Sequence, residues 1–180
     1  METHNGSFLG GRMSEAASGV MLAGALLLAM PCTAHGLECD ADNLAGVNGW
    51  VETTNVSETL QVGQVYLVVS GTDGVVFEDT GAIVGQITAA TPPTVFLNHT
   101  MIFNRGQRVE TRGDVAILGE PLAYEGETPC AFPVTEHITD LSGNKIFRNA
   151  EADVTAHGTI SFCSFNNANS FTLSGEVCLK

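Results

Sequence analysis

Basic residues are scarce in this sequence: 7 lysines and arginines stand against 20 aspartates and glutamates, and the formal net charge is −13. A surface of this sign repels nucleic acid and anionic lipid, so we expect no nucleic-acid partner. It favours solubility and cationic partners or divalent ions, although a solvated acidic exterior explains the same charge.

The chain also lacks an apolar run long enough to cross a bilayer, which requires roughly 20 residues. Its longest run covers only residues 17–30 and is followed by small side chains at Cys32–Ala34. This pattern is typical of an export signal. We therefore expect a signal peptide over residues 1–34, cleaved after Ala34, and no stable membrane anchor afterwards. Gly36 is the second choice for cleavage, and a lipoprotein or an uncleaved anchor are the alternatives.

Closely spaced cysteine pairs of the CxxC kind are absent, which argues against a zinc site. Beyond the expected signal peptide four cysteines remain: Cys39, Cys130, Cys163 and Cys178. An even number in an exported chain indicates two disulfides. We therefore expect a secreted or periplasmic protein that holds no metal and no cofactor.

The strand pattern near the C-terminal end favours one pairing of these cysteines. Two consecutive strands form a hairpin whose register sets Cys130 nearly opposite Cys163. Cys178 then lies roughly 15 Å further along, too far from Cys163 for a bridge that needs Cα atoms within about 7 Å. Cys39 remains for Cys178. Matching the inward faces would place Cys130 and Cys163 on opposite sides, so we expect a bulge near Gly158.

Long helical periodicity is missing as well, and several segments alternate at period two. We expect about eight strands, over residues 64–70, 74–79, 82–90, 94–103, 108–118, 130–140, 151–164 and 171–179. Residues 50–60 fit a ninth strand or a lead-in. The chain is thus predicted to form an all-β domain over residues 61–180, a single antiparallel eight-stranded barrel after a lead-in at 35–60. A β-sandwich is the alternative.

Two polar residues fall on inward faces of this pattern. His99 shares its face with Val95 and Leu97, and Glu136 shares its face with Val134. In the strand 108–118 the odd positions are expected inside, including Gly113, Val115 and Ile117, with Asp114 outside. A carboxylate in an apolar lumen has a raised pKa and can act as a general acid or base, so Glu136 and His99 are the candidate catalytic pair. The alternative places both at the barrel mouth.

The strands and turns of residues 94–179 resemble those of allene oxide cyclase and dirigent-type barrels. The segments that carry this resemblance are NHTMIFNRGQRVETRGDVAIL and CAFPVTEHITDLSGNKIFRNAEADVTAHGTISF. The turn Ser142-Gly143-Asn144 departs from the consecutive glycines that members often have. The resemblance implies an eight-stranded barrel, often a homo-oligomer, whose lumen in some members steers the cyclisation of an oily substrate.

Hydrolase and calcium motifs are absent, because no serine lies in a G-x-S-x-G context and no 12-residue EF-hand loop exists. The leading interpretation is a secreted, non-catalytic β-barrel that binds a small hydrophobic ligand or serves a structural role. The alternative is a cofactor-free isomerase or cyclase of the allene oxide cyclase or dirigent type. A cavity shared by Glu136 and His99 would favour the enzyme, and a filled lumen would favour the non-enzyme.

Overall fold

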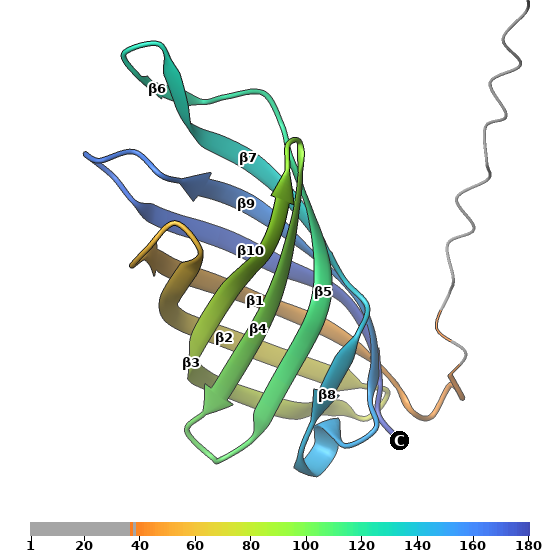
Figure 1. Ribbon diagram of the computed structural model, residues 1–180. Coiled ribbons are helices and arrows are strands. Elements are labelled where there is room, and N and C mark those ends of the chain that lie inside the picture. Colours follow the sequence, from red (N-terminus) through yellow and green to blue (C-terminus); the bar gives the residue numbers. More distant parts are fainter. Residues whose placement is uncertain (1–36, 38) are drawn as a thin grey trace, which may run out of the picture. The chain divides into compact units, whose positions relative to one another are not determined.

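The computed structural model describes residue 37 and residues 39–180, and this part of the chain is all-β (Figure 1). The signal peptide predicted for residues 1–34 lies outside the described residues. The strands are β1 (Leu44–Asn55), β2 (Leu60–Gly71), β3 (Gly74–Thr91), β4 (Thr94–Phe103), β5 (Arg108–Leu118), β6 (Ala123–Glu125), β7 (Thr128–Ile138), β8 (Leu141–Gly143), β9 (Glu151–Ser161) and β10 (Ala168–Cys178). A 3-10 turn, η1 (Lys145–Phe147), is the longest helical element among the described residues.

Eight of the strands close into an antiparallel barrel, which confirms the predicted fold class. The order is β7-β9-β10-β1-β2-β3-β4-β5, and pairing of β5 with β7 completes the ring. The short strands β6 and β8 lie outside it, β6 against the start of β7 and β8 against the start of β5. Among the described residues, no helix is long and apolar enough to cross a membrane.

Two details of the strand prediction are wrong, and glycines explain both. The strands expected at 74–79 and 82–90 form the single 18-residue strand β3. Gly81 lies in the middle of this strand and does not form a turn. Glycine is needed there because the neighbouring strand approaches closely: a Cβ on Gly81 would lie 2.6 Å from the Ile102 carbonyl oxygen. The lead-in expected at 35–60, in which residues 50–60 also fit a ninth strand, contains the barrel strand β1, and Gly49 leaves one of its inward positions without a side chain.

The inward side chains form one core along the barrel axis. Within β4 the apolar residues expected inside, Val95 and Leu97, are buried, and buried positions also alternate along much of β7, β9 and β10. At one end Phe77 packs edge-to-face on both Phe103 and Phe147, with ring centroids 5.0 and 5.2 Å apart. Phe147 comes from η1, at the lower end in Figure 1, so this aromatic cluster fills that end of the lumen.

Both disulfides join the pairs that the sequence favoured. Cys39 bonds to Cys178 and Cys130 to Cys163, with Cα atoms 5.7 and 4.9 Å apart. The bulge expected at Gly158 is absent, because β7 and β9 keep one register throughout. Instead Cys130 is itself the extra residue of β7 where it faces β6, and Cys163 lies beyond the end of β9. The chain therefore bends at the cysteines and not within β9.

Candidate functional site

The candidate site lies on neighbouring strands at one level of the barrel. Gln61 of β2 pairs with Gly85 of β3, Gly85 pairs with His99 of β4, and His99 pairs with Thr111 of β5. A Cβ on Gly85 would lie 3.1 Å from Cδ2 and 3.2 Å from Nε2 of the His99 ring. The missing side chain therefore leaves the space that the imidazole occupies.

A bulge in β5 brings in a residue that the sequence analysis placed outside. His99 pairs with Thr111 but Leu97 pairs with Asp114, so β5 has one more residue than β4 between these pairs. The extra residue is at Gly113, which has a φ of 66° and whose N–H donates to Asn98 Oδ1 at 2.8 Å. The alternation inverts beyond this point.

The inversion corrects four predicted orientations. Asp114 faces inward and is buried, whereas Val115 is only half-buried and Ile117 is 41% exposed. Ala116, expected outside, is buried in the core. A glycine inside a strand pattern is a known sign of a bulge, so Gly113 was the signal that could have revealed this arrangement.

Three titratable side chains from three strands meet at this level. His99 Nδ1 lies 2.9 Å from Asp114 Oδ2 and 3.5 Å from Glu136 Oε1. Their side chains are 10%, 0% and 7% exposed, respectively. The Thr111 hydroxyl donates to Asp114 Oδ2 and accepts the backbone N–H of His99 at 3.2 Å. The structure thus places the predicted pair, His99 and Glu136, inside the barrel next to each other, with Asp114 as a third member.

This environment raises the proton affinity of both predicted residues. Burial alone would lower the pKa of His99, but the hydrogen bond to Asp114 and the charges of Glu136 and Asp114 outweigh it and raise that pKa. Burial raises the pKa of Glu136, the Asp114 charge adds to this effect, and His99 opposes it. The cluster consequently favours protons or another positive charge.

An enclosed cavity of about 50 Å³ borders the cluster. Its wall is mostly aliphatic, and its polar members are Thr53, Gln61, His99 and Glu136. Asp114 is not part of this wall and lies behind His99, in a position to orient the ring. The volume is about a third of an apolar cavity of ~150 Å³ that holds benzene, so the enclosed part admits waters or a narrow group.

The cavity continues into a wider groove at the barrel mouth. The groove has a volume of about 560 Å³ and lies between the β3–β4 turn and the segments around Phe132 and Phe162, at the upper end in Figure 1. Val95, Leu118 and Phe162 line both spaces, so these three side chains lie between the cavity and the groove, at a boundary that we call the passage. We call this groove the vestibule.

Three buried polar atoms of the site have no hydrogen-bond partner. They are Gln61 Nε2, Asp114 Oδ1 and Glu136 Oε1. A buried polar group without a partner costs about 1–3 kcal/mol, so such atoms point to a bound molecule or water. Gln61 was missed at the sequence level, although it lies on the same alternating face of β2 as the buried Val65 and Leu67.

One nitrogen and two carboxylate oxygens of His99, Asp114 and Glu136 lie within 4.8 Å of one another, the span that a single metal ion could bridge. Hydrogen bonds alone also account for the close approach, because Asp114 Oδ2 already has both His99 and Thr111 as partners.

Comparisons of the chain with protein-family models, with curated proteins and with solved structures found no match.

Proposed function

We propose that this protein is an exported, non-catalytic barrel domain that binds a small, largely apolar molecule in its lumen. The observation that carries the proposal is the pair of unpartnered polar atoms, Glu136 Oε1 and Gln61 Nε2, on residues that line a mostly aliphatic cavity. The two disulfides support an oxidising compartment.

The shape of the lumen supports a ligand with a polar head and an apolar body. A head group that reaches Glu136 and Gln61 would remove the cost of their unpaired atoms. The enclosed cavity is too narrow for a bulky body, whereas the vestibule beyond Phe162 is wide and mainly apolar. The ligand would therefore extend from the cluster through the passage into the vestibule.

Filling the cavity tests this proposal. Ala156→Leu places a larger side chain into the cavity wall, and we expect it to abolish binding of six-carbon alcohols and amines measured by calorimetry. Ala82→Leu, at an exposed position of β3, is the matched control and should bind normally. Phe162→Ala, which opens the passage, should retain binding. Normal binding by a folded Ala156→Leu variant would contradict a site in the lumen.

The second candidate is a cofactor-free isomerase or cyclase of the allene oxide cyclase or dirigent type. The observation that favours it is that Glu136 and His99 line the same cavity, where a neutral carboxyl could donate a proton and an imidazole could accept one. The resemblance also implies a homo-oligomer, which light scattering on the mature protein would detect. Turnover of an unsaturated fatty epoxide, lost in Glu136→Gln, would support the enzyme. Binding without turnover would support the first proposal.

A further inference from the structure

We infer that the lumen selects ligands whose polar head is a protonated amine. This inference rests on the proposed function, because it names the chemical class of the ligand at the same site. It follows from the charges that the lumen and the vestibule contain, and from the unpaired acceptor oxygen of Glu136.

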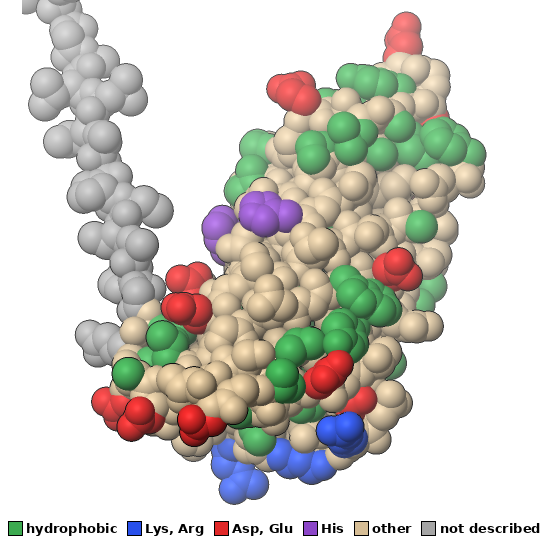
Figure 2. Space-filling view, turned by 180° about the vertical axis from the view of Figure 1, so that it is seen from behind, with side chains coloured by type: hydrophobic (Ala, Val, Ile, Leu, Met, Phe, Trp, Pro, Cys, Tyr) green, Lys and Arg blue, Asp and Glu red, His purple; other side chains and the backbone are tan. Residues whose placement is uncertain are grey.

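The interior carries carboxylates without a matching basic side chain. No lysine or arginine is among the described residues that line the cavity or the vestibule, and Glu58 is the vestibule's titratable residue. On the face shown in Figure 2, Lys and Arg side chains gather at the lower end, whereas the mouth lies at the upper end in Figure 1. With a formal net charge of −13, the protein attracts cations and repels anions.

His99 cannot neutralise both carboxylates. The Nδ1 atom of His99 is the ring nitrogen that lies close to both carboxylates. It is hydrogen-bonded to Asp114 Oδ2 at 2.9 Å. Glu136 Oε1 lies 3.5 Å from the same nitrogen and has no hydrogen bond. Once the single charge of a protonated imidazole is paired with Asp114, Glu136 keeps an acceptor that faces the cavity. Asp114 does not line the cavity, so a ligand in the cavity could reach Glu136 but not Asp114.

An ammonium group suits the unpaired Glu136 acceptor better than other heads do, and the Gln61 Nε2–H donor is then left to a water. The ammonium group brings a positive charge and three N–H donors, of which one can reach Glu136 and others can reach waters or the Thr53 hydroxyl at the same wall. A hydroxyl brings one donor and an acceptor that the Gln61 Nε2–H could reach, but no charge to pair with Glu136. A carboxylate would bring a further negative charge next to Asp114 and Glu136 in a water-poor site that offers one imidazole as counter-charge, which is unfavourable.

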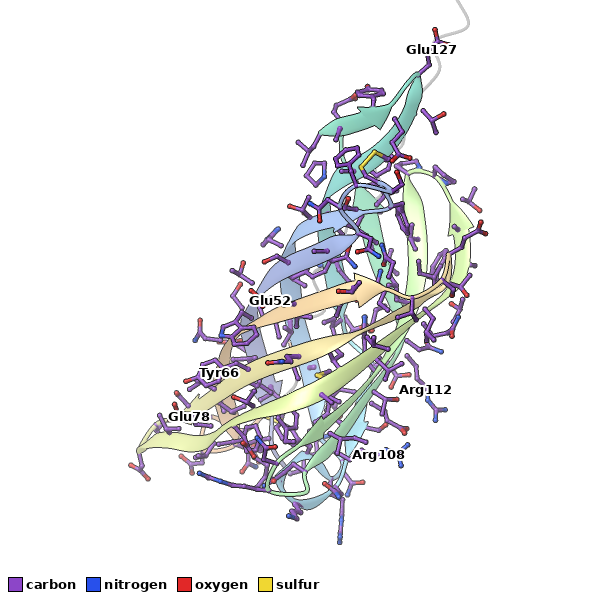
Figure 3. All side chains as sticks on the ribbon, turned by 90° about the vertical axis from the view of Figure 1, so that its left-hand side faces the viewer. Glu52, Tyr66, Glu78, Arg108, Arg112 and Glu127 are labelled. Carbon is purple, nitrogen blue, oxygen red and sulfur yellow. A yellow bond between two sulfur atoms is a disulfide. The ribbon has the colours of Figure 1, made fainter. Side chains whose placement is uncertain are left out.

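Three ligands with one six-carbon chain test the inference: hexylamine, 1-hexanol and hexanoate. Calorimetry and thermal unfolding of the mature disulfide-bonded protein at pH 7 should show hexylamine binding at least about tenfold more tightly than 1-hexanol, a factor worth about 1.4 kcal/mol. Hexanoate should not bind. Glu136→Gln should weaken hexylamine about tenfold and leave 1-hexanol unchanged. Glu127→Gln, which removes an equal charge at the distant tip of the β6–β7 hairpin (Figure 3), should retain the preference.

The outcomes separate the inference from the proposed function. Equal or tighter binding of 1-hexanol or hexanoate would overturn the amine preference and leave lumen binding intact. If none of the three ligands binds, and none of the six-carbon alcohols and amines used to test the proposed function binds either, both the amine preference and ligand binding in the lumen are overturned. Zn²⁺ is tested alone and in competition with hexylamine. If Zn²⁺ binds, if it displaces hexylamine, and if Glu136→Gln abolishes Zn²⁺ binding, the carboxylates bind a metal and the inference is wrong. Should Glu136→Gln fail to fold, the ranking of the three ligands on the unaltered protein still decides.

Discussion

Glu136 combines two properties that rarely coincide: it is buried in an aliphatic wall, and one of its oxygens has no hydrogen-bond partner. Burial is the main reason that its pKa is raised, and His99 offsets this effect only in part. A group whose pKa is raised on folding binds its proton more tightly in the folded than in the unfolded state. Glu136 therefore stabilises the fold while it is protonated and loses this contribution as it ionises.

The first prediction concerns this pH dependence. The contribution of Glu136 is fully present below the ordinary glutamate pKa of 4.5 and is lost as pH rises through its folded value. His99, with a pKa raised from 6.5, acts in the same direction at higher pH. We expect the free energy of unfolding to fall as pH rises above 4.5 and through the raised pKa values of both groups, by at most about 1.4 kcal/mol per pH unit for each group.

Urea denaturation at several pH values measures this dependence. Glu136→Gln should flatten the curve because it removes the Glu136 titration, and the variant should gain stability relative to the unaltered protein as pH rises. Glu127→Gln, at the exposed hairpin tip, should keep the slope. A slope that Glu136→Gln leaves unchanged would show that Glu136 titrates normally in the folded state.

At the scale of the element, the bulge in β5 determines which carboxylate joins His99. Gly113 has a φ of 66°, and nothing lies within 4 Å of a Cβ built there. A substitution at this position therefore costs backbone strain alone, without a steric clash. Left-handed backbone costs most residues about 1–2 kcal/mol, and asparagine tolerates it better than β-branched residues do.

The second prediction compares two substitutions at that position. Gly113→Val should destabilise the protein by about 2 kcal/mol, and Gly113→Asn by about 1 kcal/mol less. Because strain at the bulge would also displace Asp114, the NMR signals of the His99 ring should move more in the valine variant. Chemical denaturation and proton NMR measure the two effects. Equal tolerance of valine and asparagine would mean that the left-handed conformation is not required.

The elements also show where alternation can be read from the sequence and where it cannot. His99 and Glu136 were correctly assigned inward because β4 and β7 alternate without interruption around them. Asp114 was assigned outward because a bulge changes the parity of every residue beyond it, and a sequence pattern contains no register. Glycines in β1 and β3 allow neighbouring backbones to approach closely, but in the sequence they resemble the breaks and turns that end a strand.

At the scale of the whole molecule, the two disulfides reinforce different parts of the barrel. Cys39–Cys178 ties the segment before β1 to the end of β10, with a sequence separation of 139 between the two cysteines. Cys130–Cys163 spans 33 residues and, with Ala131 and Ala123, forms a small apolar cluster separate from the barrel core, beside β6. The first bond therefore constrains nearly all of the described residues, and the second constrains one end of the barrel.

The third prediction follows from these loop lengths. Loop-closure entropy assigns about 5 kcal/mol to the longer loop and about 4 kcal/mol to the shorter one, so Cys39→Ser/Cys178→Ser should cost more stability than Cys130→Ser/Cys163→Ser. Because the second pair lies outside the core, its loss should increase amide exchange in β6 and the start of β7 while the lumen keeps its ligand affinity. Denaturation, hydrogen exchange and calorimetry would measure these effects. Loss of ligand binding in a folded Cys130→Ser/Cys163→Ser variant would show that the hairpin supports the lumen as well as its own end of the barrel.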